Sequence, residues 1–172
     1  SGGFKDGTGT AVKFDRPHGV TSDSSGNIYV ADHENNVIRK VTADGVVTTY
    51  AGNGNYDHSR SSGNKLDVGF ARPMGLTFNN AGNELFITES GSGRVSKIDA
   101  SGNVSLVSGN GNWGDDVGDK NSASYQNPGT LAFDSAGNLY VGENRKIKKL
   151  VVDGAGNWTA SNFVGSGDWG EE

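Results

Sequence analysis

Residues 16–53 read RPHGVTSDSSGNIYVADHENNVIRKVTADGVVTTYAGN, and the chain restates this stretch twice. Aligned on their proline, the three copies begin at Pro17, Pro73 and Pro128, so they repeat every 56 and then every 55 residues. A repeat of this kind is typical of proteins built from similar units that pack side by side. The repeat therefore indicates the fold class more directly than any single residue does.

Within each copy, hydrophobic and polar residues alternate over short runs. In the first copy Val20, Ile28 and Val30 fall in runs rich in Val, Ile, Thr or Tyr, as in half-buried strands. Turn-forming residues separate these runs, including residues 23–27 (DSSGN) and 43–45 (ADG). The pattern predicts four antiparallel strands per copy and an all-β fold.

The second and third copies keep this frame. Their predicted strands are 75–78, 84–89, 94–98 and 104–107 in the second copy, and 130–133, 139–143, 146–150 and 158–164 in the third. We expect one structural segment over residues 1–172, with repeats at about 14–53, 70–110 and 125–166 and long connecting loops at 1–13, 54–69 and 111–124.

Composition narrows the class of protein. The chain has 172 residues and no cysteine, which excludes a disulfide framework and a thiolate metal site and favours a bacterial source. No segment is long and apolar enough to predict a membrane span. The formal net charge is −5, and the acidic residues gather in loops, which disfavours binding to nucleic acid.

The first copy also carries a family pattern. The unit Pro-x-Gly-Val-x-x-Asp-x-x-Gly-Asn-x-Tyr-Val-Ala-Asp-x-x-x-Asn-x-Ile-Arg-Lys, followed by Asp-Gly and an Ala-Gly-x-Gly tail, resembles the NHL-repeat family. The residues that match this pattern are Pro17, Gly19, Val20, Asp23, Gly26, Asn27, Tyr29, Val30, Ala31, Asp32, Asn36, Ile38, Arg39, Lys40, Asp44, Gly45, Ala51, Gly52 and Gly54. The second copy departs at Asn79, and the third at Gly129-Thr130 and in a shortened loop, residues 143–145.

The resemblance implies a β-propeller with four-stranded blades, usually six of them. The long loop before each proline resembles that of bacterial secreted and cell-surface members, so we expect an extracellular, periplasmic or cell-surface location. Three blades in an open arc leave two sheet faces uncovered. We expect this arc to be half of a six-bladed ring, closed either by a second copy as a homodimer or by further blades of a longer chain.

Connectivity places the candidate binding residues on one face. The loop after the second strand of each repeat and the long loop before each proline share this side, which we call the loop face, and binding groups sit mostly on such loops. The candidates are His18, Asp32, His33, Tyr56, His58, Met74, Glu89, Trp113, Glu143 and Trp169.

Three of these candidates recur in register. Asp32, Glu89 and Glu143 each end the second predicted strand of a repeat. Recurrence favours a structural role over general acid–base catalysis. We expect these acids to cap loop amides or to pair with the cations of the following strand, namely Arg39, Arg94 or Lys146.

Metal binding is a second interpretation. The segment Pro17-His18-Gly19-Val20 resembles the Pro-His segment that supplies a metal ligand in peptidyl-hydroxyglycine amidating lyases, which share this propeller type. The equivalent positions are Met74 and Gly129, so His18 is a lone candidate ligand for zinc. Asp115, Asp116 and Asp119 are suitable in type for calcium but lack EF-hand spacing, so a solvated acidic loop is favoured.

Two functions follow from these patterns. The first is a non-catalytic binding or scaffold module, without a cofactor, that holds a protein or a glycan at the loop face, because aromatic rings together with carboxylates suit sugars. The alternative is a metal-assisted lyase or hydrolase with a zinc or calcium site at the mouth of the central channel.

Overall fold

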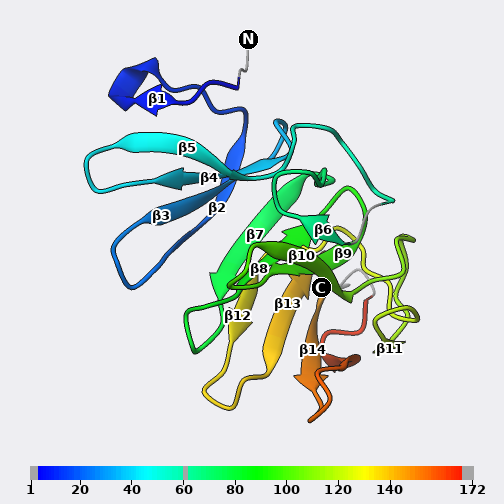
Figure 1. Cartoon of the computed structure of the whole chain (residues 1–172). Coiled ribbons are helices and arrows are strands. Elements are labelled where there is room, and N and C mark those ends of the chain that lie inside the picture. The colour runs from blue at the N-terminus through cyan, green and yellow to red at the C-terminus, as the bar shows by residue number, and fades with distance from the viewer. Residues whose placement is uncertain (1–3, 60–61, 168–172) are drawn as a thin grey trace, which may run out of the picture.

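The protein consists of three antiparallel sheets in succession along the chain (Figure 1). The structure is a computed structural model that describes residues 4–59 and 62–167. The first sheet has the order β1 (Gly7–Thr8), β5 (Val46–Ala51), β4 (Val37–Val41), β3 (Ile28–Asp32) and β2 (Pro17–Ser22). The second has the order β6 (Gly63–Asn64), β10 (Asn103–Ser108), β9 (Arg94–Ile98), β8 (Leu85–Glu89) and β7 (Pro73–Phe78). The third has the order β11 (Gly118–Asp119), β15 (Trp158–Val164), β14 (Lys146–Val152), β13 (Leu139–Glu143) and β12 (Leu131–Phe133).

Each sheet therefore has five strands, where the sequence predicted four. The four long strands of each sheet match the predicted runs, and the fifth is a two-residue strand taken from the long loop before that sheet. These short strands pair with the last long strand of their sheet, for example Gly7 with Val47 and Gly118 with Ala160. A two-residue strand carries no alternation of polar and apolar residues, so the sequence pattern missed it.

The hydrophobic core lies between neighbouring sheets. One cluster joins the first and second sheets and includes Tyr29, Ile38, Phe70 and Ile87. A second cluster joins the second and third sheets through Phe86, Val95, Tyr125, Leu139, Val141, Leu150 and Trp158. Phe70 and Tyr125, each three residues before a proline, are buried in these two clusters.

The first long strands of the three sheets, β2, β7 and β12, lie next to one another and bring the sheets together (Figure 1). Glycine makes this approach possible. A Cβ at Gly19 would lie 2.4 Å from the carbonyl oxygen of Met74, and one at Gly75 would lie 2.1 Å from that of Gly129. The Pro-x-Gly pattern thus sets the distance between neighbouring first strands.

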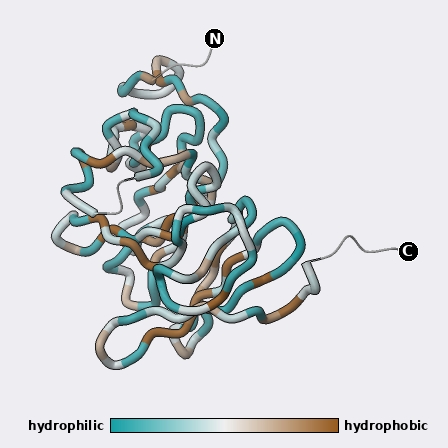
Figure 2. Tube along the Cα trace, turned by 90° about the vertical axis from the view of Figure 1, so that its right-hand side faces the viewer, coloured by the Kyte–Doolittle hydropathy of each residue, from teal (hydrophilic) through white to brown (hydrophobic). Residues whose placement is uncertain are grey.

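Hydrophobic segments are interspersed with hydrophilic ones along the chain and are not gathered in one continuous stretch (Figure 2). This alternation is what half-buried antiparallel sheets require. Among the described residues, no helix has the length and apolar character needed to span a membrane. The single helical element there is the short 3-10 helix η1 (Gly9–Ala11).

Candidate functional site

The three recurring acids hold the loops that lead into the first strands. Each carboxylate accepts a hydrogen bond from the backbone of the residue two positions before its repeat's proline. The bonds run from Asp15 N–H to Asp32 Oδ1 (2.8 Å), from Ala71 N–H to Glu89 Oε2 (2.9 Å) and from Gln126 N–H to Glu143 Oε2 (2.7 Å). We call this arrangement the carboxylate clasp. It shows that these acids cap loop amides, as the sequence predicted.

The clasp adjoins a strained turn in all three repeats. The residue before each proline has a positive φ: Arg16 at 50°, Arg72 at 54° and Asn127 at 55°. A residue before proline normally prefers extended backbone, and non-glycine residues rarely adopt positive φ. Because the same turn recurs with asparagine as well as with arginine and lies next to a clasp each time, the surrounding structure holds it in place.

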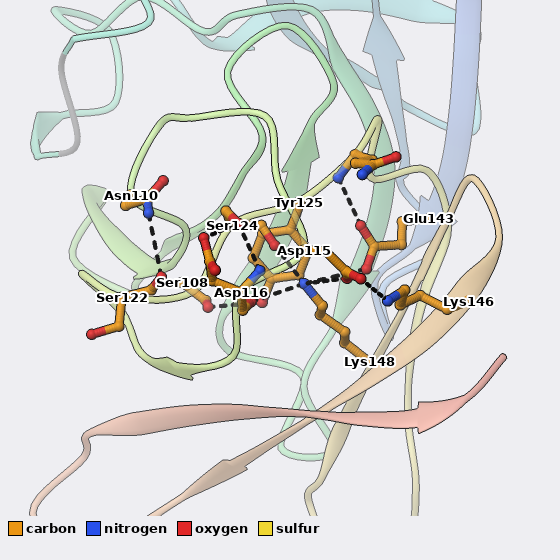
Figure 3. Close-up of polar contacts among 11 residues, drawn as sticks. Ser108, Asn110, Asp115, Asp116, Ser122, Ser124, Tyr125, Glu143, Lys146 and Lys148 are labelled. Atoms are coloured by element: carbon orange, nitrogen blue, oxygen red, sulfur yellow. Dashed lines mark hydrogen bonds and ion pairs between the residues drawn. The ribbon is translucent and has the colours of Figure 1, made fainter. Parts of the chain in front are cut away.

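A buried cation completes the clasp in the first and third sheets. Arg39 is fully buried, and its Nη1 lies 3.0 Å from Asp32 Oδ2 while its Nη2 lies 2.6 Å from Asp6 Oδ1. In the third sheet Lys148 takes this place, with Nζ 3.4 Å from Glu143 Oε1, and donates to two backbone carbonyls of the preceding loop (Figure 3).

The second sheet has a hydroxyl in place of that cation. Ser96 Oγ donates to Glu89 Oε1 over 2.5 Å, and both side chains are buried. Burial raises the pKa of Glu89 to about 7; the hydrogen bonds from Ser96 and Ala71 and the charge of Arg94 lower this pKa, whereas Asp57 raises it. Glu89 is thus a buried carboxyl group that gains and loses its proton near neutral pH.

Of the predicted cation partners, Arg39 forms the expected ion pair, whereas in the described part of the chain Arg94 and Lys146 form no ion pair with Glu89 and Glu143. Arg94 donates from Nη1 to the backbone carbonyl of His58, and Lys146 forms an ion pair with Asp115. Arg94 and Lys146 stand directly opposite Glu89 and Glu143 in the sheet register. The carboxylate reaches the residue two positions further along the strand, which lies on the same face of the sheet.

Two predicted histidines meet on the loop face. The rings of exposed His18 and buried His33 have centroids 4.7 Å apart in an edge-to-face arrangement. His33 Nε2 lies 3.4 Å from Ser90 Oγ, and its Nδ1 lies 3.5 Å from Glu34 Oε1. Burial lowers the pKa of His33, His18 and two arginines lower it further, and Glu34 opposes them.

Glu34 links the first two sheets at this point. Its carboxylate lies 3.1 Å from Arg16 Nη1 and 3.8 Å from Arg72 Nη2. Arg16 and Arg72 precede the prolines of two successive repeats. Glu34 therefore connects the two strained turns through its ion pairs with these arginines. All three side chains are at least partly exposed, and each ion pair contributes about 1 kcal/mol or less.

The predicted aromatic residues lie on the outer loops. Tyr56 is 49% exposed and donates its hydroxyl to the carbonyl of Gly91 over 3.0 Å, and the ring of His58 lies 6.0 Å from its ring. Trp113 is 64% exposed. Trp169 lies outside the described residues.

Two adjoining hollows open where the first strands meet. Their volumes are about 210 and 280 Å³, and they share Met74, Gly129 and Thr130. His18 lines the first, and Glu143 and Asn144 line the second. The structure therefore places three predicted site residues, His18, Met74 and Glu143, along these hollows. The carboxylate of Glu143 is buried in a clasp, as those of Asp32 and Glu89 are.

The acidic loop before the third sheet is used for internal bonds. Asp115 pairs with Lys146 and with Lys148 (Figure 3), and Asp119 accepts hydrogen bonds from the backbone of Asn121 and Ser122. Within residues 4–59 and 62–167, no group of three or more His, Asp or Glu side chains converges as metal ligands do.

Sequence reasoning missed Ser96 and Lys148 as clasp residues. A signal was present, because Ser96 and Lys148 occupy the repeat position of Arg39, two residues beyond the one directly opposite the acid. Combining the repeat alignment with the period of two along a strand finds all three positions.

Three repeated sheets that carry loops on one face define a protein of the β-propeller class. The NHL repeat family matches residues 14–40, so this stretch is an NHL repeat and the resemblance drawn from the sequence is confirmed. A search of curated proteins finds none that matches the chain.

Solved structures share the fold. A protein of unknown function from Bacteroides thetaiotaomicron has a TM-score of 0.71 and 22% identity, covering 90% of this chain and 36% of that one. An auxiliary nutrient binding protein from Bacteroides ovatus has a TM-score of 0.65 and 17% identity, covering 87% and 38%. The gluconolactonase XC5397 from Xanthomonas campestris has a TM-score of 0.60 and 12% identity, covering 87% and 48%. The chain thus spans between about a third and a half of the length of these structures, and identities this low show the fold alone.

Proposed function

We propose that this chain is a non-catalytic binding module whose loop face holds a glycan or a protein. The observation that carries the proposal is the pair of adjoining hollows lined by His18, Met74 and Glu143. The hollows lie on a scaffold fixed by two buried cores, and ligand sites are typically concave and few per protein. Exposed Tyr56 and Trp113 on the outer loops offer ring faces to such a ligand.

Two further points support this function. Aromatic faces together with carboxylate and amide groups, here Glu143 and Asn144, suit the apolar faces and the hydroxyls of sugars. The protein from Bacteroides ovatus, which shares the fold, is named an auxiliary nutrient binding protein. We extend the proposal to an extracellular, periplasmic or cell-surface location in a bacterium.

A screen of the labelled protein against a glycan microarray and a displayed peptide library tests the module. Met74→Trp enlarges a side chain that lines both hollows, and Ser135→Trp introduces the same side chain in an exposed turn of the third repeat. We expect Met74→Trp to weaken binding of the best ligand about tenfold, with Ser135→Trp unchanged. Absence of any ligand, or equal binding by Met74→Trp, would refute the proposal.

The adjacency of His18 and His33 favours a second candidate, a metal-assisted lyase or hydrolase. Imidazole nitrogens are good zinc ligands, but a catalytic zinc site normally has three protein ligands. Metal analysis after dialysis against zinc or calcium separates the two functions. One tightly bound zinc or calcium ion per chain, lost in the His18→Ala variant, would favour the enzyme over the binding module.

We also propose that two copies associate head to tail as a six-sheet ring. Tyr140, Ile147 and Phe163 of the third sheet occupy the repeat positions of Phe86, Val95 and Val107, and these three counterparts are all buried in the core between the second and third sheets. Ile147 is 39% and Phe163 54% exposed on this face.

The first sheet offers a matching surface. Val20 is 60% exposed at the repeat position of Leu76, which is buried against the first sheet. Light scattering on a sizing column tests the association. Twice the chain mass in wild type and the single mass in Phe163→Asp would support the ring. A single mass for wild type would refute it and favour further sheets of a longer chain as the cover.

A further inference from the structure

A third hollow, of about 220 Å³, lies between the second and third sheets beside the turn that follows β7. Its lining comes from this turn, from the turn after β12 and from the hairpin that joins β14 to β15. Because consecutive long strands are antiparallel, these turns lie at the end of the sheets opposite the loop face (Figure 1). The hollow shares no lining residue with the two at the first strands. We call it the aromatic pocket, after Phe86, Phe133 and Trp158, which line it.

The three aromatic side chains of the pocket form an apolar wall. The ring centroid of Phe86 lies 4.9 Å from that of Phe133 and 5.7 Å from that of Trp158, and the rings of Phe133 and Trp158 are 6.3 Å apart. Phe86 and Trp158 are buried in the core between the second and third sheets, and Phe133 packs against this core. Val152 also lines the pocket and is exposed. The core therefore holds the aromatic wall in place without a ligand.

A longer hairpin brings Trp158 to the pocket. In the first and second sheets, the pairing of the third and fourth long strands ends at Val47 and Val104. In the third sheet Ala160 holds this place, and the pairing continues for two more residues, to Trp158 opposite Val152. Both residues of this last pair line the pocket. The extension of the third hairpin therefore builds one side of the pocket.

The turn of the second repeat adds hydrogen-bond acceptors to the lining. This turn departs from the family pattern at Asn79, and it is one residue longer than its counterparts because it contains Glu84. Glu84 Oε1 lies 2.6 Å from Lys97 Nζ, and Glu84 Oε2 accepts from Asn79 Nδ2 over 3.0 Å. A carboxylate offers about four lone-pair sites, so Glu84 can accept further hydrogen bonds.

Asn80 supplies a second acceptor from the same turn. Its Nδ2 donates to the carbonyl of Asp134 over 2.8 Å, which links the turns of the second and third repeats. Within residues 4–59 and 62–167, its side-chain oxygen accepts no hydrogen bond. The pocket thus combines an apolar wall with two acceptor groups, and Lys97 balances the charge of Glu84.

We propose that the aromatic pocket binds one neutral monosaccharide. Its volume suits a single six-membered ring, since a cavity of about 150 Å³ already holds benzene. The apolar wall receives the C–H groups of the sugar, and Glu84 and Asn80 accept hydrogen bonds from its hydroxyls, as in ligand sites that combine apolar walls with few polar groups. A purely apolar ring would leave both acceptors without donors, and an acidic sugar would bring its carboxylate to Glu84. This site goes beyond the proposed function, which concerns the loop face.

Tryptophan fluorescence tests the site directly. In a chain that carries Trp113→Phe and Trp169→Phe, Trp158 is the remaining tryptophan, so the emission reports on the pocket. The probes are the methyl glycosides of glucose, galactose, mannose and N-acetylglucosamine, with cyclohexanol as a ring that carries a single hydroxyl. We expect at least one glycoside to shift the emission in a saturable manner, and cyclohexanol at the same concentrations to leave it unchanged.

Two neighbouring valines give a matched pair of blocking variants. Val152 is 39% exposed and lines the pocket, whereas Val151 is 44% exposed, does not line it and lies on the other face of the strand. Val152→Phe and Val151→Phe thus add the same ring on opposite faces. We expect Val152→Phe to weaken glycoside binding about tenfold or more, and Val151→Phe to change it less than twofold. Both variants should give the circular dichroism spectrum of the parent chain.

A second pair of variants places the ring on exposed turns, outside the strand pairing. Ala81 lines the pocket, and Ser25 holds the same position in the turn of the first repeat. We expect Ala81→Phe to weaken glycoside binding as Val152→Phe does, and Ser25→Phe to leave it unchanged. This pair decides the matter if Val152→Phe does not fold.

The outcomes separate the pocket from the loop-face module. No response to any glycoside, an equal response to cyclohexanol, or equal binding by the blocking variants and their controls would overturn the site. A response that disappears in Met74→Phe would mean that the sugar binds at the loop face, so the pocket would be wrong and the module would stand. A response that survives Met74→Phe and is lost in Val152→Phe or Ala81→Phe would support the pocket, even if the loop-face screen finds no ligand.

Discussion

The Ser96 hydroxyl donates to the Glu89 carboxylate over 2.5 Å at a position where the first and third sheets place a buried cation. A hydroxyl stabilises a carboxylate less than a cation does, because it carries a dipole and no net charge. The second clasp is therefore the one of the three in which ionisation is opposed by burial without a close counter-charge. This difference makes Glu89 a pH-sensitive group in the middle sheet.

We predict that stability falls as pH rises through the range set by Glu89. Its pKa is about 4.5 when unfolded and about 7 when folded, so the folded state binds the proton more tightly. The stabilisation is fully present below pH 4.5, declines as the pH rises to 7, and is lost above it. The shift corresponds to about 2–4 kcal/mol. Urea unfolding at pH 5, 6, 7 and 8 measures this slope.

Glu89→Gln provides the control for that prediction. The amide is neutral at every pH, accepts from Ala71 N–H as the acid does, and removes the titration. His33 acts in the opposite direction, because its pKa is lowered by burial and its protonation at low pH opposes folding. The difference between wild type and Glu89→Gln isolates Glu89. A wild-type slope that persists in the variant would contradict the assignment.

Ser96→Ala tests the hydroxyl in the same clasp. The substitution leaves Glu89 Oε1 without its donor in a buried site, so the ionised form loses more than the protonated form. We expect a loss of about 1–3 kcal/mol at pH 8 and a smaller loss at pH 5. Ser105→Ala, at a partly buried serine of the neighbouring strand, is the control. An equal loss at both pH values would show that packing alone is affected.

The clasps also show how far the sequence predicts this structure. The repeat places Asp32, Glu89 and Glu143 in register, and alternation gives the long strands, because both depend on local spacing. The two-residue strands and the partners Ser96 and Lys148 depend on which residues lie diagonally across a sheet. The hollows depend on how neighbouring sheets pack, so only their candidate residues were predictable.

Arg39 is expected to be the most costly side chain of the first clasp to remove. It is fully buried and pairs with both Asp32 and Asp6. Arg39→Ala leaves Asp32 buried without a counter-charge, for which we expect a loss of about 3–5 kcal/mol. Arg39→Lys introduces the residue type that the third sheet has at the equivalent position, Lys148. We expect this variant to lose roughly 1–2 kcal/mol of unfolding free energy. Urea unfolding at pH 7 compares them. Equal losses would mean that the guanidinium's geometry matters more than its charge.

Gly75 tests whether the close approach of the first strands holds the sheets together. In Gly75→Ala the new Cβ would lie 2.1 Å from the backbone oxygen of Gly129, and backbone cannot yield as a flexible side chain does. The strands β7 and β12 must separate, which loosens the core between the second and third sheets. We expect a loss of about 1–3 kcal/mol in urea unfolding. Gly154→Ala is the matched control, since a Cβ there meets nothing within 4 Å and should change stability by about 0.5 kcal/mol or less. If the two variants are equally stable, glycine at this position does not set the spacing of the sheets, and the buried side chains between them do.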